Sequence, residues 1–371
     1  MLDFTSALYL GICHGSQDLR PFGALTTGAP AALREPHEAA TIAAGLAALV
    51  GVERATLARS TLHAFWDLFS IFESEPARIL ADAGSYPIAR WGAERAVLRG
   101  AEFVTFRHHD PAALKQLLRR PPAGKGRAWI VADGFCAGCG RLSPLAEYLA
   151  LAREAGARLV VDDTQALGVL GEGRGPEAPY GHGGGGSLRA SESAGPELLL
   201  VASLAKGFGA PLTVIGGTRM TIENFESKSQ TRVHASPPSL ADLRSAERAL
   251  AVNREEGEQR RLTLLALVAQ LRRGLRRLGL ALAPTSFPLQ AIRGPVGISL
   301  PVLYRRLGGL GVQAVLRRPV CVNATEIAFL VTAAHLPKQI DDAIRAVATA
   351  LPAATDRVGL LSTSDARMEA P

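Results

Sequence analysis

The sequence predicts an α/β protein whose large domain has a mainly parallel sheet flanked by helices, with a smaller C-terminal α+β domain. Three observations predict this fold class. Strand-like and helix-like segments alternate from about residue 38 to residue 220, and that alternation is typical of parallel sheets. The chain has 371 residues, which is long enough for two domains. Hydrophobic residues make up 47% and charged residues 20%, so a large core can be buried.

The elements of the large domain follow from hydrophobic spacing. Apolar residues at helical spacing predict helices, and short continuous apolar runs predict buried strands. In chain order we expect a helix over 37–51, a strand over 128–135, a helix over 144–156 and strands over 157–163 and 197–206. Sites of α/β proteins lie outside the carboxyl ends of such strands, so that edge of the sheet is where chemistry is expected.

A long helical stretch from Leu240 to about Gly279 leads into the C-terminal part. That part contains the segments 301–316 and 326–335 and a helix over 336–351. We therefore divide the chain into an N-terminal segment, a large domain, a linking helical stretch, a small C-terminal domain and a disordered tail, over residues 1–35, 36–240, 241–280, 281–352 and 353–371.

Composition limits the classes of partner. The formal charge of +7 favours anionic partners such as phosphorylated cofactors, coenzyme A or an acidic carrier protein. Nucleic acid is not expected, because aromatic residues make up 5% and the arginines are spread over amphipathic helices. No apolar run reaches the roughly 18 residues of a membrane span, and the first residues do not resemble an export signal. Four cysteines are too few for a disulfide framework, so a cytoplasmic protein is expected.

Lys206 and Asp162 form a candidate catalytic pair. Asp162 and Asp163 end one predicted strand, and Lys206 follows a later one. Gly207 and Gly209 leave the backbone beside the lysine without side chains, which predicts the close approach of another group. Taken alone, these residues fit a surface lysine or a simple ion pair. They also fit a lysine that holds pyridoxal phosphate as a Schiff base, with an aspartate that keeps the pyridine nitrogen protonated.

Around these residues the sequence resembles the α-oxoamine synthases, a branch of the fold-type I pyridoxal-phosphate enzymes. The resemblance runs from YLG near the start, through FRHHDPAALKQLL, the stretch from DGF to GEGRG, and SLAKGFG, to TAAHLPKQIDDAI near the end. It implies a fold-type I transferase with pyridoxal 5'-phosphate on Lys206. The implied reaction condenses an amino acid with an acyl thioester of coenzyme A or of a carrier protein, and decarboxylation gives an aminoketone.

The resemblance also implies roles for residues around the cofactor ring. Asp162 corresponds to the aspartate on the pyridine nitrogen. Ser203, three residues before Lys206, corresponds to a hydroxyl that contacts the cofactor phosphate. Tyr86 falls where the family stacks a histidine on the ring, and an aromatic side chain preserves stacking, although a core tyrosine is the alternative.

Two further segments are implied at the phosphate. ARSTLHAF corresponds to a turn that opens a helix whose backbone amides hold the phosphate, which places Ser60, Thr61 and Leu62 there. A helix N-terminus with Ser and Thr caps is an anion site, and an ordinary N-cap is the alternative. The family forms homodimers with shared active sites, so His234 or Ser236 of one subunit is expected at the neighbour's phosphate site.

Several positions depart from the family pattern. Gln165 stands where the family has a histidine on the cofactor, and glutamine cannot transfer protons near neutral pH. Ala328 aligns with the arginine that clamps the amino-acid carboxylate, and Arg317 or Arg318 is the candidate to compensate. Ala137 replaces a serine near the cofactor. These departures keep open another reaction at the same cofactor, such as transamination or a different carbon–carbon bond formation on an unusual amine, and also a non-catalytic binding protein.

Three other motifs are not assigned a catalytic or binding role. Cys136 and Cys139 form a C-x-x-C pair, but a metal site needs two more ligands and no histidine has suitable sequence spacing. We therefore expect no metal and interpret the pair as structural. GEGRG lacks the glycine spacing of a dinucleotide loop. The glycine run 183–186 predicts a mobile loop of unassigned role.

Overall fold

The computed structural model describes residues 1–71, 78–120, 126–293 and 297–352. The chain divides into two compact units: the larger is Leu8–Arg261, and the smaller joins Met1–Ala7 to Leu262–Pro371. The division falls inside the long helix α9 (Leu240–Arg277), within the stretch expected to link the two parts. The first seven residues belong with the C-terminal part. The tail expected over 353–371 lies outside the described residues.

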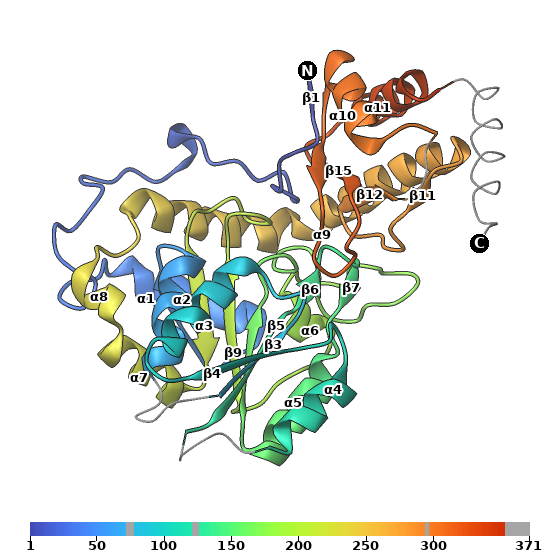
Figure 1. The fold of residues 1–371 in the computed structure, drawn as a ribbon. Coiled ribbons are helices and arrows are strands. Elements are labelled where there is room, and N and C mark those ends of the chain that lie inside the picture. The colour runs from blue at the N-terminus through green and yellow to red at the C-terminus, as the bar shows by residue number, and fades with distance from the viewer. Residues whose placement is uncertain (72–77, 121–125, 294–296, 353–371) are drawn as a thin grey trace, which may run out of the picture. The chain divides into compact units, whose positions relative to one another are not determined.

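The larger unit is built on a seven-stranded sheet (Figure 1). Its spatial order is β2 (Arg54–Ala58), β10 (Thr213–Gly217), β9 (Leu198–Ser203), β8 (Arg158–Asp162), β5 (Ala128–Asp133), β3 (Arg78–Asp82) and β4 (Glu102–Phe106). Strand β10 is antiparallel to both of its neighbours, and the other pairs are parallel. The predicted, mainly parallel sheet is confirmed.

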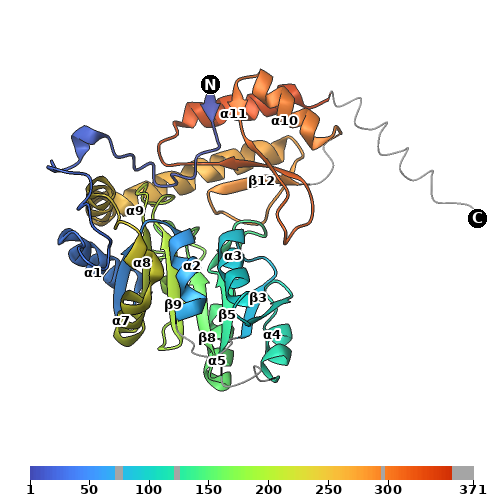
Figure 2. The same ribbon diagram turned by 60° about the vertical axis from the view of Figure 1, so that its left-hand side comes forward.

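Helices cover both faces of this sheet (Figure 2). One layer contains α1 (Glu38–Val50), α4 (Pro111–Leu118), α5 (Leu145–Ala155) and the first part of α9, and the other contains α2 (Thr61–Ile71), α3 (Pro87–Val97) and α7 (Arg219–Lys228). Alternate residues of a strand point to opposite faces. In β8, Leu159 and Val161 join the first core, whereas Val160 joins the second.

Shorter elements connect the layers of the larger unit, and polar side chains fix several helix ends. The short elements are a 3-10 turn (Ser16–Asp18), the hairpin of β6 (Phe135–Cys136) and β7 (Arg141–Leu142), α6 (Ser187–Ala190) and α8 (Gln230–His234). Asp110 caps α4 by accepting a hydrogen bond from Ala113 N at 2.9 Å. Thr218 caps α7 in the same way from Thr221 N at 3.2 Å. Such caps satisfy amides that have no partner within the helix.

The smaller unit is α+β, as predicted. Its antiparallel sheet has the order β11 (Ala281–Leu282), β12 (Leu289–Arg293), β15 (Glu326–Leu330) and β14 (Val315–Arg317). The helices are α10 (Leu300–Gly309) and α11 (Pro337–Ala350), and β1 (Leu2–Asp3) pairs in parallel with β13 (Val312–Gln313). Within the described part of the chain, no helix combines the length and the apolar character needed to cross a membrane.

Candidate active site

Neighbouring strands of the larger unit end in polar residues at one edge of its sheet. The parallel strands β3, β5 and β8 end at Asp82, Asp133 and Asp162, and the next strand, β9, ends at Ser203. In the register of β5 and β8, Asp133 lies directly opposite Asp162. Since parallel strands present their carboxyl ends on one side, this edge gathers carboxylates from segments far apart in sequence.

Lys206 lies in the turn after β9, close to two of these carboxylates. Burial lowers the pKa of Lys206 from its usual value, and the negative charges of Asp162 and Asp133 partly oppose that shift. Its Nζ atom lies 5.8 Å from the centroid of the Tyr86 ring. The structure therefore brings together Lys206, Asp162 and Tyr86, three residues that the sequence analysis assigned to one site.

The charges of the two carboxylates act on each other. Burial raises the pKa of Asp162, although its Oδ1 accepts a hydrogen bond from Thr164 N at 3.0 Å. Burial also raises the pKa of Asp133, and the charge of Asp162 raises it further. A buried and a partly buried carboxylate beside one amine favour a second cationic group between them. A protonated pyridine nitrogen is such a group, so the donor set fits pyridoxal phosphate.

The glycines beside Lys206 are required by close contacts of the backbone. A Cβ atom on Gly207 would lie 2.4 Å from the carbonyl oxygen of Leu167. Gly209 has a φ of +65°, and its Cβ would lie 2.4 Å from the carbonyl oxygen of Ile12. The close approach predicted from these glycines is therefore made by the protein's own backbone, which fixes the turn that carries the lysine.

Gln165 and Ser203 are held by neighbouring side chains. Gln165 Oε1 accepts a hydrogen bond from the Tyr9 hydroxyl at 2.9 Å, which fixes the side chain that replaces the family's histidine. The backbone N–H of Ser203 donates to Thr164 Oγ1 at 3.0 Å. The Ser203 hydroxyl accepts from Ala205 N at 3.2 Å. Because a hydroxyl can accept and donate at once, its proton can still be given to an anion.

The segment expected at the phosphate opens helix α2. Ser60 precedes the helix, and its Oγ lies 2.8 Å from Nδ1 of His63 and accepts weakly from His63 N at 3.5 Å. Thr61 and Leu62 are the first helical residues, and Leu62 is exposed. The N-cap is thus observed. The first amides of a helix carry partial positive charge, so the start of α2 can attract an anion. The role of these residues at the phosphate stays a prediction.

The two residues expected at a neighbouring subunit's phosphate site lie on the surface of the larger unit. His234 ends α8 and Ser236 follows it, and both are exposed in the larger unit. Their role at a neighbour's site stays a prediction.

The two candidate substrate arginines belong to the smaller unit. Arg317 pairs with the buried Glu326 at 2.5 Å, and Arg318 donates to Asn323 Oδ1 at 2.9 Å from an exposed position. Ala328 is buried in the central strand β15. The guanidinium of Arg317 is therefore already paired with a buried carboxylate of its own unit. The exposed Arg318 is the better candidate to bind the carboxylate of an amino-acid substrate.

The sequence analysis missed three residues of the site. Asp133 receives a hydrogen bond from Tyr86 N at 3.0 Å and acts electrostatically on Lys206. Thr164 links Asp162 to Ser203, and Tyr9 holds Gln165. A signal for Asp133 was present, because it lies near the end of the strand predicted over 128–135. Thr164 and Tyr9 had none, since their contacts depend on the tertiary fold.

The glycine-rich segment is packed rather than open. Gly184, Gly185 and Gly186 are buried, and the expected mobile loop is anchored at Ser187. Ser187 N donates to both oxygens of the buried Asp163, at 2.8 and 3.1 Å. Burial raises the pKa of Asp163 to about 7. This carboxyl therefore takes up a proton in the folded protein at a higher pH than it does in the unfolded chain.

We expect Asp163→Asn to change how stability depends on pH. An acid whose folded pKa is raised binds its proton more tightly in the folded state, so its contribution to stability falls as pH rises from about 4 to about 7. The difference in unfolding free energy between wild type and the variant should change by about 2–4 kcal/mol over that range. Urea midpoints measured from pH 5 to pH 8 check this, and parallel curves for the two proteins would contradict it.

Comparisons with known proteins agree with this geometry. The family described as aminotransferase class I and II matches residues 36–295. An 8-amino-7-oxononanoate synthase of Alkalilimnicola ehrlichii is 34% identical over 69% of this chain and 63% of its own length. The synthase of that name from Klebsiella pneumoniae strain 342 is 30% identical over 93% of this chain and 88% of its own length.

A solved structure shows the same fold. Serine palmitoyltransferase from S. paucimobilis, solved with bound PLP, superposes with a TM-score of 0.79 at 20% identity and covers 93% of this chain and 86% of its own. The chain spans 63–64% of the length of the first two curated relatives in the matched regions. It spans 88–89% of others.

Proposed function

The chain belongs to the α-oxoamine synthase branch of the class I and II aminotransferases, and from that membership we propose a pyridoxal-phosphate enzyme. It condenses an amino acid with an acyl thioester of coenzyme A or of a carrier protein. The products are an aminoketone, carbon dioxide and the free thiol. One observation carries the proposal: the amine of Lys206 stands beside the buried carboxylate of Asp162 and the partly buried carboxylate of Asp133 at the strand ends.

Lys206 holds the cofactor and moves the proton. When bound, pyridoxal phosphate supplies an electron-withdrawing ring that stabilises negative charge on the α-carbon of the amino acid. Lys206 attaches the cofactor through Nζ, and its lowered pKa increases the fraction of neutral amine, which is the form that attacks an aldehyde. With an amino acid bound at the cofactor, the free amine of Lys206 would be the base for the proton of the α-carbon.

The surrounding residues orient the cofactor. Asp162 keeps the pyridine nitrogen charged, and Thr164 N holds its carboxylate in place. Tyr86, whose ring centroid lies 5.8 Å from Lys206 Nζ, would stack on the ring. The amides at the start of α2, together with the Ser60 and Ser203 hydroxyls, bind the phosphate. Gln165 offers a hydrogen bond to the ring without transferring a proton.

We expect Tyr86→Ala to weaken cofactor binding. Loss of ring stacking costs about 0.5–1.5 kcal/mol, which raises the dissociation constant about two- to tenfold. Tyr86→Phe keeps the ring, so its constant should stay within about twofold of wild type. Absorbance titration of the cofactor-free proteins measures both. An equal loss in the two variants would mean that the hydroxyl, not the ring, makes the contact.

Release of thiol tests the proposed reaction. The cofactor-loaded protein is incubated with single amino acids and a series of acyl-coenzyme A or acyl-carrier substrates, and thiol and carbon dioxide are measured together. The proposal expects both products in equal amounts, with neither formed when the amino acid is omitted. Carbon dioxide without thiol, or neither product with any pair, would overturn it.

Ala328 stands where the family has the arginine that binds the amino-acid carboxylate, and this difference supports a second candidate function. An aminotransferase would pass the amino group to a 2-oxo acid without consuming thioester, and exchange of labelled amino groups in the same assay detects this. A protein that binds the cofactor but forms no adduct with any amine would favour the non-catalytic alternative.

The assembly that we propose is a homodimer with shared active sites. The exposed positions of His234 and Ser236 agree with a role toward a neighbour. We also propose the cytoplasm as its compartment, which rests on the low cysteine content.

A further inference from the structure

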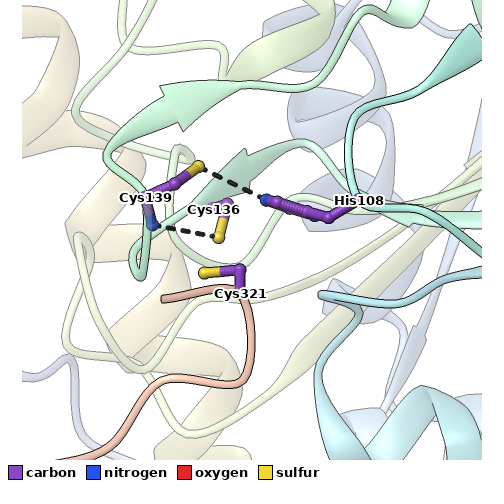
Figure 3. Close-up of side chains that lie close together, drawn as sticks. All are labelled: His108, Cys136, Cys139 and Cys321. Atoms are coloured by element: carbon purple, nitrogen blue, oxygen red, sulfur yellow. Dashed lines mark hydrogen bonds between the residues drawn. The ribbon is translucent and has the colours of Figure 1, made fainter. Parts of the chain in front are cut away.

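Three side chains with metal-binding atoms converge in the larger unit. His108 lies between β4 and α4, Cys136 ends β6, and Cys139 lies in the turn between β6 and β7. Their ligand atoms lie within 4.8 Å of one another. Figure 3 shows the His108 ring directed at Cys139, and Nε2 lies 3.3 Å from Sγ. The fold thus supplies the histidine that sequence spacing alone did not reveal.

The spacing suits a tetrahedral ion. Zinc bonds of about 2.0–2.3 Å place tetrahedral ligand atoms about 3.5–3.8 Å apart. The cysteines are separated by two residues, which is a common spacing in zinc sites. Neither cysteine is in a disulfide. Cys139 N donates to Cys136 Sγ at 3.4 Å, which fixes the two cysteines of the hairpin relative to each other (Figure 3).

A second, independent observation is the orientation of His108. Its Nδ1 is 2.5 Å from Asp82 Oδ1, so Nδ1–H can donate to this carboxylate while Nε2 faces Cys139. Metal-binding histidines commonly donate their other N–H to a carboxylate in this way. Asp82 is itself fixed by Gly84 N at 2.7 Å and by the Tyr148 hydroxyl at 3.1 Å.

We propose that His108, Cys136 and Cys139 bind a Zn²⁺ ion, with water or a further side chain in the fourth position. Two thiolates and an imidazole select zinc over magnesium and calcium, which prefer oxygen ligands. Binding releases the two thiol protons and involves no redox change. The ion ties the β6–β7 hairpin to the segment after β4, and the hairpin starts two residues after Asp133. Its role is to hold that carboxylate edge in place.

Metal content of the full-length protein tests this inference. Protein purified without chelators, then dialysed against excess zinc and desalted, should hold one equivalent of zinc by mass spectrometry of the element. His108→Ala and the double variant Cys136→Ser/Cys139→Ser should lose at least about nine-tenths of it. Cys13→Ser and His37→Ala remove an exposed thiol and an exposed imidazole and should keep it. Asp82→Asn should weaken zinc affinity about ten- to a hundredfold.

Cobalt provides a readout that does not depend on the variants folding. Co²⁺ titrated into the reduced wild type, without added pyridoxal phosphate, should give thiolate charge-transfer absorption that saturates at one equivalent and disappears when zinc is added. Equal zinc in wild type and double variant, no thiolate band with cobalt, or a Cys136–Cys139 disulfide in protein kept under reducing conditions would overturn the inference. None of these outcomes depends on the proposed catalytic function.

Discussion

Lys206→Ala should remove the visible absorption of the cofactor-loaded protein and lower turnover by about 10³-fold or more. The lysine serves twice in the proposed reaction, first as the covalent attachment and then as the base at the α-carbon. Loss of both roles leaves a cofactor held only by its phosphate and ring contacts. The spectrum before and after dialysis measures the attachment, and thiol release with an amino acid and an acyl thioester measures the turnover.

Lys228→Ala is the matched control, because Lys228 is an exposed lysine of the same unit. It should keep both the absorption and the rate. Borohydride treatment of wild type incubated with pyridoxal phosphate at neutral pH should reduce the imine and leave the pyridoxyl group on Lys206 ahead of Lys228, since burial lowers the pKa of Lys206 and so raises its neutral fraction. A Lys206→Ala protein that keeps the band after dialysis would show that another amine holds the cofactor.

The strand ends of the large sheet show why so much of this site could be predicted. Buried parallel strands are continuous apolar runs, and polar residues that follow them fall at one edge whatever the details of packing. Asp162 and Lys206 were found by that rule. Asp133 obeys the same rule but was not predicted, because a lone aspartate near a strand end, with no lysine paired to it in the sequence, does not by itself indicate a site.

Contacts between distant segments could not be predicted. Leu2 pairs with Val312, and no local signal in the first seven residues indicates a partner so late in the chain. The reversed strand β10 follows a turn fixed by tertiary contacts. His108 meets Cys139 only because β3 places Asp82 behind the imidazole. Hydrophobic periodicity specifies which elements form and which face is buried, but these pairings depend on the assembled fold.

Asp162→Asn should lower turnover by about a hundredfold or more while the covalent attachment at Lys206 survives. The amide oxygen of asparagine can still accept the hydrogen bond from Thr164 N, so the local geometry is kept. A neutral amide cannot stabilise a protonated pyridine nitrogen, and an unprotonated ring withdraws electrons poorly. The visible band reports attachment, and thiol release reports the rate.

Asp133→Asn is the informative comparison, because Asp133 lies opposite Asp162 and also acts on the charge of Lys206. If Asp162 alone supports the ring nitrogen, Asp133→Asn should cost much less turnover and mainly move the pH profile. The charge of Asp162 raises the pKa of Asp133, so in Asp162→Asn the remaining carboxylate stays ionised to lower pH. Equal losses in the two variants would assign the ring nitrogen to the pair, and wild-type turnover in Asp162→Asn would remove Asp162 from the mechanism.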